Sequence, residues 1–135
     1  MSPLKLGKVA AIERSVARAR EEFAAAGAGF ARDFTRQDAA ILNILRACEL
    51  ALDLANIVIR ERGLGIPQSS RDSFRLLADA GLLAVDLSER LQHMIGFGNV
   101  AVHQYQTLNL AIVETILRRD LDDVLRYCEV LAALD

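Results

Sequence analysis

The helical spacing of apolar residues is the feature of this sequence that most constrains its fold. In the first segment these residues follow one another in steps of three, four, three, four and three, so they share one face of a helix. They are Val9, Ile12, Val16, Ala19, Phe23 and Ala26. Glycines at positions 27 and 29 end this segment. The strict apolar–polar alternation of a half-buried β-strand occurs nowhere in the sequence, so we expect an all-α protein.

A second apolar stretch predicts another long helix. Thr35 and Asp38 form a capping-box pattern before it, and Gly63 ends it. Its apolar stripe comprises Ile41, Leu45, Cys48, Leu52, Ala55 and Ile59. Its polar face comprises Arg46, Glu49, Asp53, Asn56 and Arg60. Asp53 and Asn56 lie mid-helix among apolar neighbours, so we expect these two members of the polar face to lie near a polar site.

Three more helices are predicted in the remainder of the chain. After a loop at 64–68, Ser69 or Ser70 caps a short helix. Asp86 opens the next helix with a second capping pattern, and a last amphipathic helix runs over 110–131. Short connections between helices favour antiparallel neighbours. The sequence therefore predicts an antiparallel bundle of four long helices and a short one.

Length and composition indicate a single domain over residues 1–135. Hydrophobic residues make up 53% of the chain, which is more than a small monomer readily buries. We therefore expect a partner chain to cover part of this apolar surface. The net charge of −2, from 16 basic and 18 acidic side chains, excludes a broadly basic protein that coats nucleic acid. A small local binding site is still compatible with this charge.

The sequence also indicates a cellular compartment. Cys48 and Cys128 are far apart and are expected to be reduced core thiols. Residues 1–6 lack the apolar core of an export signal. The run without charged residues between Arg90 and Glu114 contains many polar side chains and two glycines, so it does not read as a membrane span. We expect a cytoplasmic protein.

The segment from Met94 to Tyr105 departs from the amphipathic pattern. Gly96 and Gly98 stand inside a predicted helix, where each costs about 1 kcal/mol relative to alanine. One interpretation is a kink with close helix–helix packing, together with a hydrogen-bonded core histidine. The other is a functional site around His103, because a histidine titrates near neutral pH and suits proton transfer.

Other kinds of chemical site have weaker support in the sequence. Neither His93 nor His103 has a serine or cysteine nucleophile beside it in a recognisable turn. The Gly-Phe-Gly at 96–98 makes a poor phosphate loop, because no strand precedes it and no Lys-Ser/Thr follows. Two histidines ten residues apart without a carboxylate cluster are a weak metal signal. We expect no metal and no cofactor.

The string from Met94 to Tyr105 resembles the signature of HepT-like proteins in the HEPN (higher eukaryote and prokaryote nucleotide-binding) superfamily. Their usual string reads Met-Val-Gly-Phe-Arg-Asn-Ile-Ala-Val-His-x-Tyr, and this chain has Met-Ile-Gly-Phe-Gly-Asn-Val-Ala-Val-His-Gln-Tyr. The segments 38–56, 61–68 and 76–81 are also similar to the family's standard segments. The resemblance covers nearly the whole chain after about residue 35, and it implies the HEPN fold.

The resemblance implies a toxin–antitoxin function. HepT-like proteins are metal-independent ribonucleases that act as homodimers and bring two Arg-x4-His motifs into one cleft. Their antitoxin is a minimal nucleotidyltransferase that adds AMP to the tyrosine of the His-x-Tyr element. By this resemblance the histidine is His103, the AMP acceptor is Tyr105 and the asparagine after the motif arginine is Asn99. Asp53 or Asn56 would fill the place of the polar residue that supports that arginine.

The implied partners are a second copy of the chain, the cognate nucleotidyltransferase antitoxin and RNA as substrate, with no role for DNA or a membrane. Metal-free RNA cleavage needs proton transfer from the 2′-hydroxyl and to the leaving oxygen, together with a cation for the phosphate. A histidine suits the first task, and the planar guanidinium of an arginine suits the second.

The chain departs from the family at the motif arginine, where it has Gly98. Arg90 lies about 12 Å earlier along the helix, too far to take its place without rearrangement. We therefore predict that the fold, the dimer and the antitoxin pairing persist while ribonuclease activity is weak or absent. The alternative is a non-catalytic dimeric module that binds a nucleotidyltransferase or a nucleotide. A third reading is a plain structural bundle in which His103 and Tyr105 are core residues.

Overall fold

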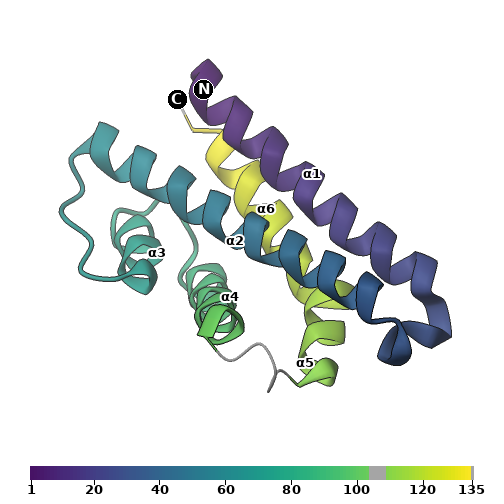
Figure 1. The fold of residues 1–135 in the computed structure, drawn as a ribbon. Helices are drawn as coiled ribbons and strands as arrows, with labels where there is room; N and C mark the ends of the chain where they lie inside the picture. Colours follow the sequence, from purple (N-terminus) through teal and green to yellow (C-terminus); the bar gives the residue numbers. More distant parts are fainter. Residues whose placement is uncertain (104–108, 135) are drawn as a thin grey trace.

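The computed structural model describes residues 1–103 and 109–134, and the side chains of residues 1–98 and 109–134. Within these residues the chain is helical and has no strand, as the apolar spacing predicts (Figure 1). The elements are α1 (Pro3–Ala26), η1 (Gly27–Arg32), α2 (Phe34–Arg62), α3 (Ser70–Asp79), α4 (Val85–His103), α5 (Leu110–Thr115), the π-helical turn η3 (Ile116–Asp120) and α6 (Leu121–Ala132). Because α5, η3 and α6 follow one another directly, the described chain has four long helical runs and the short α3, which confirms the predicted fold class.

The helices begin and end mostly where the sequence predicts. Gly63 adopts the left-handed conformation, with φ 61° and ψ 44°, and ends α2. Ser69 caps α3 by accepting the backbone N–H of Asp72 at 3.2 Å. The predicted cap at Thr35 is wrong, because Asp33 caps α2 through its carboxylate and Thr35 lies inside the helix. A carboxylate one residue before the helix takes the free N–H groups of its first turn.

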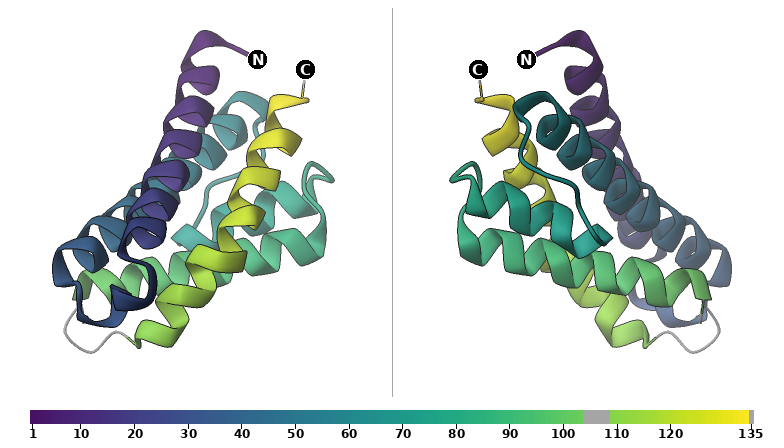
Figure 2. Two further views of the ribbon diagram at one scale, coloured as in Figure 1. Left: turned by 90° about the vertical axis from the view of Figure 1, so that its right-hand side faces the viewer. Right: turned by 90° about the vertical axis from the view of Figure 1, so that its left-hand side faces the viewer.

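The core lies where α1, α2 and the last helical run come together (Figures 1 and 2). Tyr127 of α6 is fully buried, and its hydroxyl donates to the carbonyl of Ala51 on α2 at 2.8 Å. The ring of Tyr127 also packs edge-on against Phe74 of α3, with the centroids 5.6 Å apart. One side chain therefore joins three helices. Cys48 and Cys128 are free and buried, as predicted.

The overall arrangement separates the ends of the chain from the end of α4. The start of α1 and the end of α6 lie side by side in all three views (Figures 1 and 2). The last turns of α4 and the start of α5 lie at the opposite end of the molecule. Among the described helices, none combines the length and the apolarity that crossing a bilayer requires.

Candidate functional site

The last turns of α4 carry the segment that departs from the amphipathic pattern. The chain is helical through Gly96 and Gly98 and up to His103. The backbones of Asn99 and His103 therefore belong to α4, while their side chains lie outside the described part of the structure. Tyr105 lies wholly outside the described residues. The roles of these three residues stay predictions.

A pocket of about 210 Å³ lies beside Gly98, between α2, α4 and the start of α3. Its described lining consists of Leu45, Cys48, Glu49, Leu52, Ser70, Ile95 and Gly98. A β-carbon built on Gly98 would have Leu45 Cδ2 at 3.9 Å, which is an ordinary van der Waals contact. Position 98 therefore accepts a β-carbon without displacing a described neighbour.

The polar side chain that α2 contributes to this pocket is Glu49, which is exposed. The two residues that the sequence favoured lie elsewhere. Asp53 faces α1, where Lys8 Nζ lies 3.4 Å from its carboxylate. Asn56 faces α3 and accepts the hydroxyl of Ser73 at 2.7 Å. The described lining of the pocket includes neither of them.

The spacing of α2 gave a signal for Glu49 that sequence reasoning did not use. Glu49 follows Leu45 by four residues and precedes Leu52 by three, so all three share one face of the helix. Leu45 and Leu52 also line the pocket. A carboxylate on the same face as these two leucines is therefore better placed to face the pocket beside Gly98 than Asp53 or Asn56.

The cysteine in the pocket is not a nucleophile. Burial raises the pKa of the Cys48 thiol to about 12, so the thiolate form is scarce at neutral pH. Its Sγ lies 3.9 Å from the carbonyl oxygen of Met94 on α4, at the long limit of a sulfur hydrogen bond. Over the described ranges, no three histidine, cysteine or acidic side chains come close enough to hold a metal ion.

Arg90, the arginine that precedes the segment on α4, is engaged elsewhere. Its Nε lies 3.1 Å from the carboxylate of Asp123 on α6, and its Nη1 lies 3.3 Å from that of Asp86. The hydrogen bond to Asp123, above all, raises the pKa of Arg90 further. These contacts hold the guanidinium against α6 and Asp86.

A second arginine approaches the segment from α3, and sequence reasoning missed it. Arg71 Nη2 lies too close to the place where a β-carbon on Gly96 would stand for both atoms to fit. The Cζ and Nε atoms of Arg71 lie 3.5 and 3.8 Å from that place. Only a glycine at position 96 allows so close an approach without moving the guanidinium. This contact is with a side chain of α3, whereas the first interpretation of the glycines expected a kink with close helix–helix packing.

Comparisons with known proteins all find similarity to HepT-like proteins. A family model described as Ribonuclease HepT-like matches residues 12–131. The mRNA nuclease HepT of Shewanella oneidensis is 44% identical over 133 residues, which cover 98% of this chain and 99% of that protein.

Solved structures of toxin–antitoxin proteins also resemble this chain. A tri-AMPylated Shewanella oneidensis HEPN toxin in complex with an MNT antitoxin has a TM-score of 0.94 and 42% identity, over 99% of this chain and 100% of that one. A toxin–antitoxin structure with AMP-PNP has a TM-score of 0.92 and 42% identity, over 98% of this chain and all of that one.

Proposed function

The chain belongs to the HepT-like ribonuclease family, and from that premise we propose that it is the ribonuclease toxin of a toxin–antitoxin pair. The observation that carries this proposal is the similarity of the whole chain to a HEPN toxin that was solved with its MNT antitoxin. The similarity extends over 99% of this chain, so it covers the scaffold as well as the α4 segment.

In this proposal α4 carries the reaction. His103 transfers protons while the 2′-oxygen of the RNA attacks the neighbouring phosphorus and the 5′-oxygen leaves. One imidazole accepts the 2′-hydroxyl proton and a second one protonates the leaving oxygen. A homodimer supplies both imidazoles in one cleft, and Asn99 contacts the RNA beside them. RNA is the substrate, and the cytoplasm is where the proposed substrate and antitoxin are available.

The proposed homodimer has apolar surface available to it. Phe34 and Leu42 on α2 are exposed by 72% and 47%, and Ile112 on α5 is exposed by 52%. Exposed apolar side chains of this size favour coverage by another chain. A second copy would remove them from water and account for the high apolar fraction of the sequence.

The proposed control point is Tyr105. The partner nucleotidyltransferase transfers AMP from ATP to the phenolic oxygen, which attacks the α-phosphate and releases pyrophosphate. The added phosphate brings negative charge two residues from His103. Because RNA is itself a polyanion, this charge repels the substrate from the site.

Gly98 removes the cation that the family has at this position, so we propose that the chain is a weak ribonuclease. Loss of one preorganised donor to a transition-state oxygen costs on the order of 10²–10³ in rate. Glu49 in the pocket beside residue 98 is placed to orient a guanidinium there by an ion pair.

The test compares this chain with Gly98→Arg, each expressed with and without the cognate nucleotidyltransferase. Gly98→Arg should arrest growth without the partner and cleave RNA in vitro, and His103→Ala in that background should abolish both effects. Gly98→Met is the matched control, because it adds a long side chain without charge. If Gly98→Arg stays harmless and cleaves no RNA, the enzyme proposal fails.

Gly98 itself favours the second candidate function, a non-catalytic dimeric module that binds the nucleotidyltransferase or a nucleotide. The discriminating measurement is mass spectrometry after incubation with the partner and ATP, beside an RNA cleavage assay. AMP on Tyr105 together with cleavage by Gly98→Arg supports the toxin. Stable binding of the partner without either reaction supports the module.

A further inference from the structure

The contact of Arg71 with Gly96 brings a positive charge from α3 to α4, and the arginine that carries it lies outside the family signature. The guanidinium lies directly against the backbone of α4, where a side chain at residue 96 would displace it. Arg71 is exposed to solvent, so this contact does not contribute to the core. The contact therefore needs another explanation.

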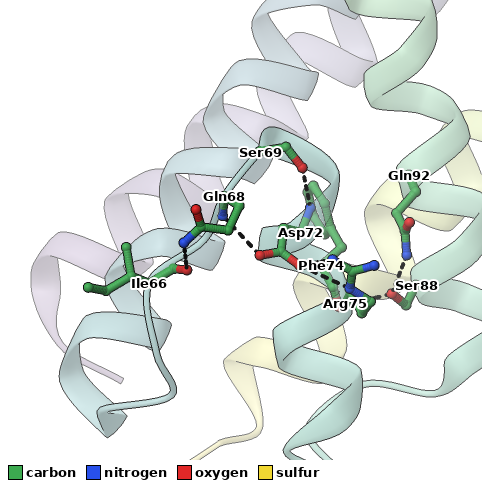
Figure 3. A network of polar contacts seen from close by, with 8 residues as sticks. All are labelled: Ile66, Gln68, Ser69, Asp72, Phe74, Arg75, Ser88 and Gln92. Atoms are coloured by element: carbon green, nitrogen blue, oxygen red, sulfur yellow. Dashed lines mark hydrogen bonds and ion pairs between the residues drawn. The ribbon is translucent and has the colours of Figure 1, made fainter.

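The position of Arg71 follows from the way α3 is anchored (Figure 3). Ser69 caps the helix, and the backbone N–H of Gln68 donates to the carboxylate of Asp72 at 2.9 Å. On the side toward α4, the Ser88 hydroxyl donates to the carbonyl of Phe74 at 2.9 Å. Ser88 is buried, so this bond holds α3 against α4 firmly. The first turn of α3 is thus fixed in front of Gly96.

The guanidinium of Arg71 is available to an anion. Arg75, one turn later on α3, forms an ion pair with Asp72 (Figure 3). For Arg71, by contrast, no residue in the described part of the chain supplies an ion pair or a hydrogen bond. An arginine that no described residue engages suits the planar, bidentate recognition of a phosphate.

Helix geometry places this guanidinium on the same side of α4 as His103. Gly96 and His103 are seven residues apart, which is nearly two turns at 3.6 residues per turn. Their Cα atoms therefore share one face of α4, separated by about 10 Å along its axis. Ser70, the neighbour of Arg71, lines the pocket beside Gly98. Arg71 thus approaches α4 next to the space that the missing arginine side chain leaves.

We propose that Arg71 supplies the phosphate-binding cation that position 98 lacks. With an RNA strand along this face of α4, the Arg71 guanidinium would hold the phosphate that an arginine at position 98 would otherwise bind, and His103 would act on that phosphate from farther along the same face. Gly96 is required because it lets the guanidinium reach the α4 backbone. This inference rests on the proposed ribonuclease function, and it identifies a contact to substrate that comes from α3 and not from the α4 motif.

The first test is binding of a fluorescent single-stranded RNA oligonucleotide, followed by anisotropy at several salt concentrations. Arg71→Ala should weaken binding about tenfold and lower the salt slope by about one. Arg75→Ala, with the same loss of charge on the same helix, should leave binding within about twofold, because that arginine is engaged by Asp72. Arg71→Lys should give an intermediate affinity, since it keeps the charge and loses the bidentate geometry.

The second test is a double-mutant cycle between residues 71 and 98, read as RNA cleavage. Arg71→Ala should remove most of the residual cleavage of this chain. In the Gly98→Arg background the same change should cost less than about threefold, because the restored arginine takes over the phosphate. Melting temperatures of all variants identify any that fail to fold. Gly96→Ala is a further variant, which displaces the guanidinium of Arg71 without removing a charge.

The outcomes separate the two proposals. If the chain binds or cleaves RNA and Arg71→Ala behaves like Arg75→Ala, the role of Arg71 is overturned while the ribonuclease proposal stands. If no variant, Gly98→Arg included, binds or cleaves RNA, both proposals fail. Additive effects at residues 71 and 98 would also overturn the role of Arg71, because they would mean that the two arginines do not serve the same phosphate.

Discussion

Charged side chains make different contacts between α1 and α2 than between α3 and α4. Between α1 and α2, Lys5 pairs with Glu61, Lys8 with Asp53 and Glu22 with Arg36. Between α3 and α4, Arg71 faces a glycine without a carboxylate among the described residues. Ion pairs thus cross between α1 and α2, whereas Arg71 reaches from α3 to α4 without one among the described residues. If the proposed RNA contact lies between α3 and α4, the α1–α2 pair serves as its scaffold.

The largest loss of stability should come from a change in the core beneath α1 and α2. Ile44 of α2 is fully buried, and Ile44→Ala should lower the free energy of unfolding by about 2–5 kcal/mol through lost burial and a cavity. Chemical denaturation measures this change. RNA affinity per folded molecule should stay the same. A loss of affinity in the folded variant would break the separation between scaffold and binding surface.

A smaller loss of stability is expected at Tyr127, which contacts both α2 and α3. Tyr127→Phe keeps the ring packed on Phe74 and leaves the carbonyl of Ala51 without its buried donor. We expect a loss of about 1–3 kcal/mol in unfolding free energy. Denaturation curves of the variant and of Leu131→Val, a neighbouring core change without a hydrogen bond, separate the polar effect from a general loss of packing.

Gly96→Ala should change stability and function in opposite directions. An alanine inside a helix favours folding by up to about 1 kcal/mol over glycine, although the displaced Arg71 reduces that gain. RNA affinity should fall, because the guanidinium loses its place against α4. Gly7→Ala in α1, where a β-carbon meets open space, is the matched control and should leave RNA binding unchanged. Unchanged affinity in Gly96→Ala would contradict the contrast between the two regions.

The smallest effect concerns pH. The backbone N–H of Gln68 and the side chain of Arg75 hold the pKa of Asp72 below its ordinary value of 3.8. A carboxyl whose pKa is lowered by folding stabilises the fold above its unfolded pKa, and this contribution is lost as the pH falls through the lower, folded pKa. Asp72→Asn should therefore be less stable at pH 7, with a difference that shrinks below pH 3.8. Thermal melts at both pH values measure it.

The helical spacing was enough to predict the helices, because a buried stripe depends on contacts every three or four residues within one element. Ile12 and Val16 are buried as that spacing requires, and Gly63 ends α2 in the predicted place. The cap of α2 was mispredicted because Thr35 and Asp33 both offer side-chain oxygens, and only the start of the helix decides between them.

The contacts between helices were not predictable in the same way. Whether Glu49, Asp53 or Asn56 faces the pocket depends on how α2 is rotated against α3 and α4, and that rotation is set by packing across the whole bundle. The approach of Arg71 to Gly96 joins residues on two helices through a loop. A sequence shows the glycine and the arginine, but their distance follows only from the fold.

The neighbouring chain ends offer a practical route to single-molecule and surface-based measurements. Because α1 starts and α6 ends side by side at the end of the molecule opposite the last turns of α4, a tether or dye attached there stays away from the proposed RNA face (Figures 1 and 2). The same proximity suits head-to-tail ligation, since ends that lie close together can be joined without stretching the fold. Immobilised in this orientation, the protein would present the proposed RNA face of α3 and α4 to the solution.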